Sequence, residues 1–218
     1  MYNLKKILIC VVCLAFVFGA TATFLIEKNK PEIIEINGII PELTEQELIL
    51  NSDIIVKGNV LEIGESKWSN PKSIKGKRNI LQTDITVKIN EILSGEYSSR
   101  NVVVRIDKGY DKKSNTVMES SGYPDFEVGE NVILFLSRDD GDLLTDEDYF
   151  VLTGMKNGKW LLNDENQITS KLNSSKSNSL DILKDKIREE KQNNPDWKEQ
   201  KAKEKQQIIE KNKELFGE

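Results

Sequence analysis

The sequence of 218 residues contains no histidine, and its two cysteines, Cys10 and Cys13, both lie in an N-terminal apolar run. Without histidine the chain lacks the commonest general base and metal ligand, and it lacks the Ser-His and Cys-His nucleophilic dyads. Residues 27–218 contain no thiol, so this part of the chain has neither a disulfide nor a thiolate metal site. These absences exclude the usual zinc sites and most nucleophilic enzymes.

The chain also lacks an excess of positive charge. Its 31 Lys and Arg residues against 36 Asp and Glu residues give a formal net charge of −5, and we expect no nucleic-acid partner. It has no Gly-x-Ser-x-Gly elbow and no Gly-rich phosphate loop. The composition favours a binding protein with no catalytic residues and no cofactor. The alternatives are a secreted hydrolase that uses carboxylates, and a structural or assembly protein that acts through its C-terminal tail.

An uncharged run of 20 residues, Ile7–Ile26, follows Lys5 and Lys6. A helix of that length spans about 30 Å, the thickness of the hydrocarbon core of a bilayer. The same segment fits a signal peptide cleaved after Ala22, although apolar residues beyond that site favour a retained anchor. Both interpretations export the rest of the chain. We expect a single-pass membrane protein with its C-terminal domain outside, with residues 7–26 in the membrane, or a secreted protein if the segment is cleaved.

The patterning divides the chain into four parts. Residues 1–26 are the signal anchor or signal peptide, 27–43 a linker, 44–170 a β-domain, and 171–218 a charged helical tail. A capping box at Thr44–Glu47 predicts a short helix through about Asn51. In the tail, Leu180, Leu183 and Ile187 recur at helical spacing, and Asn194-Pro195-Asp196 predicts the start of a second helix, ending near Phe216. The tail either docks partly on the domain or binds a partner.

Alternation of apolar and polar residues predicts several strands in the β-domain. Val132–Leu136 is apolar on both faces, which is typical of a central strand. Asn157-Gly158 is a strong signal for a hairpin between strands at Tyr149–Met155 and Lys159–Leu162. The other predicted strands begin at Ile54, Asp84, Val102 and Gln167. The predicted fold is mainly β, a small OB-like barrel of about five to seven antiparallel strands, with a short N-terminal helix and a C-terminal helical tail.

Three stretches of the chain, Leu50–Val60, Thr86–Gly95 and Phe126–Leu136, resemble the netrin-like domain. The shared pattern is an acidic residue opening the first strand, a Ser-Gly turn after a later strand, and a Gly-Glu turn before an apolar strand. The resemblance covers about residues 44–137 and implies the OB-type barrel found in tissue metalloproteinase inhibitors. Those inhibitors chelate zinc through an N-terminal cysteine. Because residues 27–218 contain none, the resemblance implies the fold and not that activity.

The first loop with candidate ligand-binding residues runs from Gly64 to Leu81. It combines an aromatic ring with several cations, opposed only by Glu65, and in OB-type barrels this loop commonly contributes to the ligand site. Outside the cytoplasm, such residues suit an anionic polymer or a lipid surface, whereas the alternative is a solvated loop. The candidate residues are Trp68, Lys72, Lys75, Lys77 and Arg78.

The second loop with candidate residues, Lys108–Phe126, is long for a barrel connection. Loops of this length in a compact domain often carry function. Its aromatic residues Tyr110 and Tyr123 either bind a ligand or cover the end of the barrel. The envelope partner, a protein or an anionic polymer, is expected to contact one or both loops.

A cluster of carboxylates between two predicted strands is a candidate calcium site. Hard oxygen ligands at this density suit Ca²⁺, but the spacing is not that of an EF-hand, and the alternative is an acidic hairpin tip. The candidate calcium ligands are Asp139, Asp140, Asp142, Asp146 and Asp148. No other metal site is expected.

Overall fold

The computed structural model describes residues 30–37, 40, 43–73, 75, 78–138, 148–170, 177–203 and 206–207. The membrane or signal segment expected at residues 1–26 lies outside these ranges, as does the far end of the tail. The same holds for the site candidates Lys77, Asp139, Asp140, Asp142 and Asp146. Within the described ranges, no helix has the length and apolar character needed to cross a bilayer.

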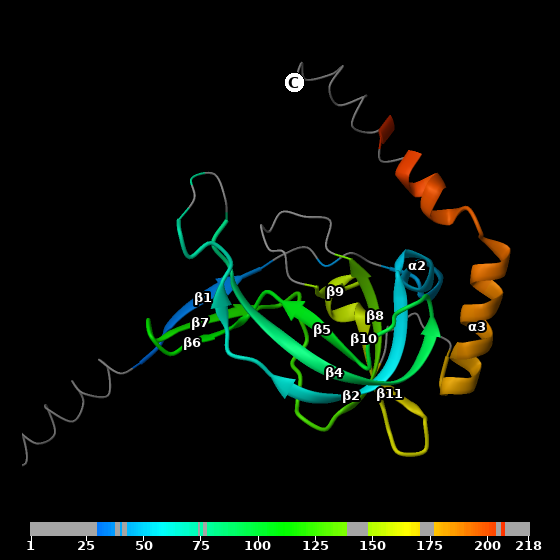
Figure 1. Cartoon of the computed structure of the whole chain (residues 1–218), viewed down its shortest axis with the longest axis horizontal. Coiled ribbons are helices and arrows are strands. Elements are labelled where there is room, and N and C mark those ends of the chain that lie inside the picture. The colour runs from blue at the N-terminus through cyan, green and yellow to red at the C-terminus, as the bar shows by residue number, and fades with distance from the viewer. Residues whose placement is uncertain are drawn as a thin grey trace, which may run out of the picture.

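Five strands close into a barrel in the order β2-β4-β5-β9-β8 and back to β2 (Figure 1). The chain is therefore mainly β, consistent with the small OB-like barrel predicted from the sequence. The pairing of β5 with β9 is parallel, with Val104 opposite Phe150, so the expectation of antiparallel strands throughout was wrong. A closed ring with an odd number of strands cannot alternate in direction at every step, and one pair must run parallel. The barrel strands are β2 (Ile54–Ile63), β4 (Leu81–Ser94), β5 (Asn101–Ile106), β8 (Asn131–Arg138) and β9 (Phe150–Leu152).

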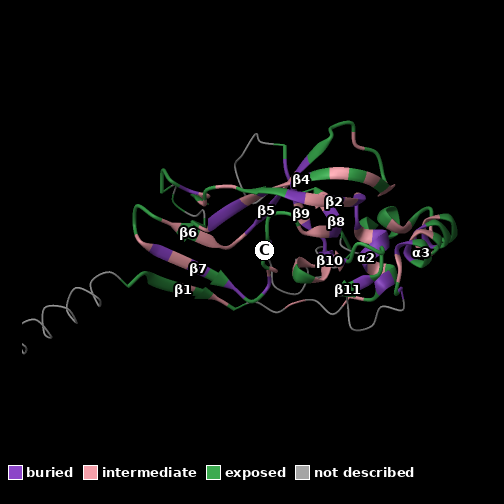
Figure 2. Cartoon of the chain, turned by 90° about the horizontal axis from the view of Figure 1, so that it is seen from below, coloured by how far each residue is buried: buried purple, intermediate pink, exposed green. Residues whose placement is uncertain are grey.

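The barrel strands separate two apolar cores. The interior of the barrel is filled by side chains such as Val56, Val104 and Leu134. A second core lies outside the barrel wall, beneath helices α2 (Glu45–Asn51) and α3 (Leu180–Asn193), and contains Ile133 and Phe135 of β8. The prediction that β8 is a central strand is confirmed, because alternate side chains of β8 enter the two cores. Figure 2 shows buried residues concentrated in the barrel and beneath the helices.

The predicted capping box of α2 and the predicted helix at Leu180–Ile187 are confirmed. At α2, the Glu47 amide donates to Thr44 Oγ1 at 3.1 Å, and the Thr44 amide donates to Glu47 Oε2 at 2.9 Å. In α3, Leu180, Leu183 and Ile187 are buried in the outer core, so the first helix of the tail docks on the domain. Residues 197–203 are helical after Pro195, as the sequence predicts.

The expected hairpin at Asn157-Gly158 is absent from the described part of the chain. Strand β9 pairs with residues 136–138 of β8, and β10 (Lys159–Leu162) pairs with residues 132–134, so the two lie end to end along one edge of β8. The segment between them forms a 3-10 helix, Met155–Gly158. The type I′ hairpin turn that Asn-Gly favours needs positive φ at both central positions, but here Gly154 and Met155 have positive φ, and Asn157 and Gly158 do not. The predicted edge strand is present as β11 (Ile168–Ser170).

A three-stranded sheet projects from one end of the barrel (Figure 1). It contains β1 (Glu32–Ile36), β7 (Thr116–Ser120) and β6 (Gly109–Asp111), in the order β1-β7-β6. β1 lies within the segment predicted as a linker, and the long loop after β5 contains the β6–β7 hairpin. Neither of them was predicted from the sequence. No local pattern marks β1, because it is stabilised by parallel pairing with the sequence-distant β7. A further short strand, β3 (Lys67–Trp68), pairs with the start of β4.

Candidate functional site

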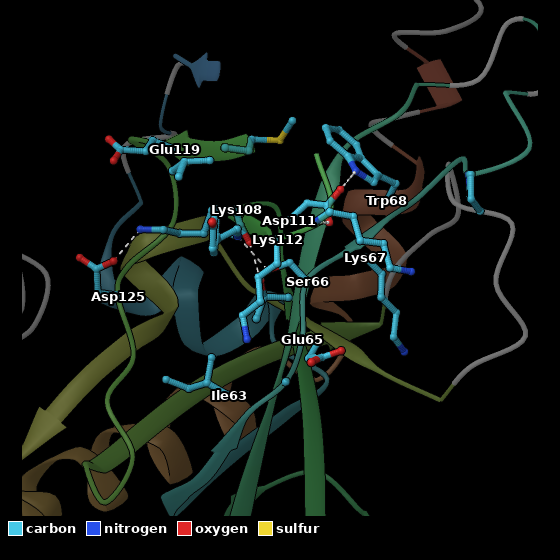
Figure 3. Close-up of a pocket in the computed structure, with 18 residues that line it drawn as sticks. Ile63, Glu65, Ser66, Lys67, Trp68, Lys108, Asp111, Lys112, Glu119 and Asp125 are labelled. Carbon is cyan, nitrogen blue, oxygen red and sulfur yellow. Dashed lines mark hydrogen bonds and ion pairs between the residues drawn. The ribbon is translucent and has the colours of Figure 1, made fainter. Parts of the chain in front are cut away.

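The two loops selected from the sequence lie side by side and line one cleft of about 1060 Å³ (Figure 3). One wall comes from the end of β2 and the residues after it, and the other from the β6–β7 hairpin. The aromatic and apolar side chains that line the cleft are Ile63, Trp68, Pro71, Tyr110, Val117 and Met118. The structure thus brings Trp68 and Tyr110 into the same cleft.

The two walls approach most closely at Gly109 of β6. The Ser66 hydroxyl lies 2.8 Å from Thr83 Oγ1 and accepts a hydrogen bond from the Tyr110 amide at 3.0 Å. A Cβ atom on Gly109 would lie 2.1 Å from Ser66 Oγ and 2.4 Å from Thr83 Oγ1. Only glycine allows this approach, so the sequence fixes the hairpin against the loop at this point.

Trp68 and Asp111 connect the walls through their side chains (Figure 3). The Trp68 indole Nε1 donates to Asp111 Oδ2 at 3.0 Å. Hydrogen bonds from the Ser114 hydroxyl, the Trp68 indole and the Lys113 amide lower the pKa of Asp111 to about 2. The Asp111 carboxylate therefore stays ionised at any ordinary pH. It holds the half-buried ring of Trp68 against the hairpin.

The charge inside the cleft is mixed. Lys67, Lys112 and Lys113 line it, and none of them forms an ion pair with another described residue. Lys108 pairs with Asp125 at 2.6 Å, and Glu65 and Glu119 add negative charge. The excess of positive charge lies on the adjoining loop, where Lys72, Lys75 and Arg78 are exposed. The sequence placed only Glu65 against these cations, whereas the structure adds Asp111 and Glu119 of the hairpin and Asp125 from the segment after it.

The remaining predicted residues lie elsewhere. Tyr123 packs against the barrel interior, and its hydroxyl donates to Asp107 Oδ2 at 3.3 Å, so it does not line the cleft. Asp148, the described member of the acidic cluster, pairs with Arg138. Sequence reasoning missed Asp111, Lys112 and Lys113. The run Asp111-Lys112-Lys113-Ser114-Asn115 carries a turn signal in which an Asp side chain accepts from the backbone two residues on, and this could have revealed the hairpin.

In comparisons with known proteins, no protein-family model and no curated protein matches the chain. The function is therefore argued from the arrangement of the cleft.

We expect chelators to leave the thermal midpoint of the full chain unchanged. The sequence has no histidine, and the described residues contain no group of ligands able to hold a metal ion. The measurement is thermal unfolding, followed by circular dichroism, with and without EDTA and EGTA. A midpoint that drops by several degrees with EGTA, and returns with Ca²⁺ but not Mg²⁺, would contradict this and point to the acidic segment at 139–148.

Proposed function

We propose that the chain is an exported, membrane-anchored binding module of the bacterial cell envelope, without enzymatic activity, that holds an anionic envelope polymer in the cleft beside Trp68. In this proposal residues 7–26 are the membrane anchor, and no cofactor is needed. The anchor is supported by the length of the apolar run and by the lysines before it.

The convergence of the two loops is the observation that carries the proposal. The loop after β2 follows the first strand of the barrel, and in OB-type barrels this loop commonly contributes to the ligand site. It shares the cleft with the β6–β7 hairpin, so an aromatic wall lies beside exposed cations from two separate segments. Aromatic rings with cations around them suit an extended polyanion, because rings give contact area and lysines give attraction.

The netrin-like resemblance belongs to the same proposal. Two of its turns have backbone conformations that favour glycine: φ is 81° at Gly95, after β4, and 92° at Gly129, before β8. The resemblance concerns barrel architecture alone. It carries no information on the ligand.

A carboxylate hydrolase is the less favoured function. A carboxyl that protonates a leaving group needs a raised pKa, whereas the hydrogen bonds around Asp111 lower the pKa of that carboxyl to about 2. Asp125, which also lines the cleft, is paired with Lys108 and is 90% exposed. Neither residue has the apolar surroundings that favour acid catalysis.

Neutralising the loop cations is expected to abolish binding of a polyglycerol-phosphate polymer. Lys72, Lys75, Lys77 and Arg78 would be replaced together by glutamine in the full chain, held in neutral-lipid nanodiscs. Because the protein is net negative, attraction is local, and at physiological salt charges beyond about 8 Å are screened. Binding, measured by calorimetry, should fall steeply as salt is added. Trp68→Ala is expected to cost about 1 kcal/mol, which is roughly a fivefold loss of affinity.

The matched control removes the same amount of charge away from the cleft. Lys88, Arg100, Lys156 and Arg188 are exposed cations that do not line the cleft, and their joint replacement by glutamine should leave binding unchanged. Trp68→Phe keeps an aromatic ring but removes the hydrogen bond to Asp111. This variant therefore distinguishes contact between the ring and the ligand from the role of Trp68 in holding the hairpin in place. Equal binding by the two quadruple variants would contradict the proposed site.

A further inference from the structure

The chain enters the folded domain at the tip of the β6–β7 hairpin. The Glu32 amide, at the start of β1, donates to the Asn115 carbonyl at 2.9 Å. The Asn115 side-chain amide donates to the Lys30 carbonyl at 3.2 Å. Lys30 and Glu32 are therefore fixed to the hairpin tip, residues 112–115. Figures 1 and 2 both place the β1-β7-β6 sheet at one end of the molecule and α3 at the other.

Only a short segment separates this point from the apolar run. The run ends at Ile26, and five residues, 27–31, precede β1. Even fully extended, five residues reach at most about 18 Å. If residues 7–26 span a bilayer, the hairpin tip must lie close to the headgroups, whereas α3 lies at the opposite end of the molecule.

The outward face of the three-stranded sheet has an apolar row. Ile33, Val117 and Tyr110 are in register across β1, β7 and β6. Ile33 is 60% exposed and Tyr110 is 44% exposed, although both lie in a folded sheet. The Tyr110 hydroxyl donates to Asn115 Oδ1 at 3.0 Å, so its polar end points toward the hairpin tip. An apolar ring with a polar end is typical of residues at a membrane interface.

The charges are sorted between the two faces and along the sheet. Two acids, Glu32 and Asp111, are in register on either side of Thr116 on the opposite face, where Thr116 is buried toward the barrel. Lys30, Lys112 and Lys113 are exposed at the tip end. Glu35 and Glu119 lie opposite each other on the outward face of β1 and β7. They are two residues farther from the hairpin tip than the apolar row. Cations therefore lie where the bilayer would be, and acids lie away from it.

We propose that the outward face of the β1-β7-β6 sheet, with the hairpin tip 112–115 leading, rests on the headgroups of an anionic bilayer. This inference rests on the proposed membrane anchor. It orients the domain, and it places the opening of the cleft next to the membrane surface, because Tyr110 and Val117 of the sheet face and Lys112 of the hairpin tip also line the cleft.

A fluorescent label at Val117 would test the docking in the full chain. With Cys10→Ser and Cys13→Ser, the variant Val117→Cys carries a single thiol for an environment-sensitive dye, in the middle of the apolar row. The reference label is at Asp181→Cys, exposed on α3 at the other end of the molecule. The vesicles contain phosphatidylcholine with or without phosphatidylglycerol, and a headgroup-linked quencher. We expect strong quenching at 117 and little at 181, and only with phosphatidylglycerol present.

A short tether alone would hold the domain near the bilayer whatever the charge of the hairpin tip, whereas docking on anionic headgroups should depend on the lysines of the tip. Lys112→Gln with Lys113→Gln should lower the ratio of docked to undocked domain roughly thirtyfold, about fivefold per lysine. The exposed pair Lys88→Gln with Lys156→Gln should leave it unchanged. A second label at Ile33→Cys, in the same apolar row and 60% exposed, guards against a local disturbance at 117. Protein that floats with the vesicles while the labels at 117 and 33 stay unquenched would overturn the docking and leave the anchor intact. Protein that does not float would overturn both.

Discussion

Replacing Trp160 by alanine is expected to lower the free energy of unfolding by about 3–5 kcal/mol. Trp160 has no exposed surface. Its ring packs against Phe135 with centroids 4.8 Å apart, and its indole donates to the Asn157 carbonyl at 3.0 Å. The side chain fills the core between the barrel wall and the two helices. Its removal leaves a cavity that the surrounding strands and helices fill only in part.

Urea unfolding followed by far-UV circular dichroism measures this loss, since linear extrapolation gives the free energy in water. Trp197→Ala is the matched control. Trp197 is partly exposed, and its indole also has a partner, Asn51 Oδ1 at 2.8 Å. Its loss should cost about 1 kcal/mol, the usual size for a hydrogen bond that water can replace. Equal losses for the two variants would show that the outer core is not a cooperative part of the fold.

The second large effect is expected at Lys159, whose side chain is only 6% exposed. Its Nζ donates to Glu130 Oε2 at 2.6 Å and to the Asp125 carbonyl at 2.5 Å, and it lies 4.4 Å from the centre of the Phe126 ring. Glu130→Gln removes the compensating charge, and we expect a loss of about 3 kcal/mol, because a nearly buried ammonium is left without a carboxylate.

The double variant Glu130→Gln with Lys159→Met should recover most of that loss, since it removes the stranded charge and keeps an apolar side chain of similar length. Asp125→Ala is the surface control. It breaks the Lys108 pair, in which Asp125 is 90% exposed, and should cost less than about 1 kcal/mol. If Glu130→Gln lowers the free energy of unfolding no more than Asp125→Ala does, the Lys159 ammonium is solvated in solution. The buried ion pair then contributes no more to stability than the surface pair.

Both predictions concern residues that connect the barrel to the helices and turns packed around it. Trp160 joins the wall to α2 and α3, and Lys159 holds the turn that leads into β8. Trp160 lies in the outer core, away from the cleft, so the effects of its substitution and of the cleft substitutions should add. Lys159 contacts the backbone of Asp125, which lines the cleft, so its substitution should be tested for an effect on binding as well as on stability.

Local sequence patterns determined the elements that depend on near neighbours. The alternation in Ile85–Ile89 predicted β4, because a half-buried strand needs apolar residues on one face only. The capping box at Thr44 predicted the start of α2, since both of its hydrogen bonds join residues three positions apart. The apolar run at residues 132–136 predicted a strand covered on both faces, and the two cores provide that cover. The acidic balance and the absence of histidine likewise needed no structure.

Only the tertiary structure decided how distant segments meet. Asn157-Gly158 has the composition of a hairpin turn, but β8 pairs with the strands on both sides of it, and hydrogen bonding to that shared edge outweighs the local preference. β1 has a partner far along the chain, so no local signal could reveal it. The cleft arises in the same way, because Trp68 and Asp111 belong to different loops and become neighbours only when Gly109 lets the hairpin approach Ser66. Short-range patterns specify strands and helices, whereas contacts between distant residues form only when the whole chain is packed.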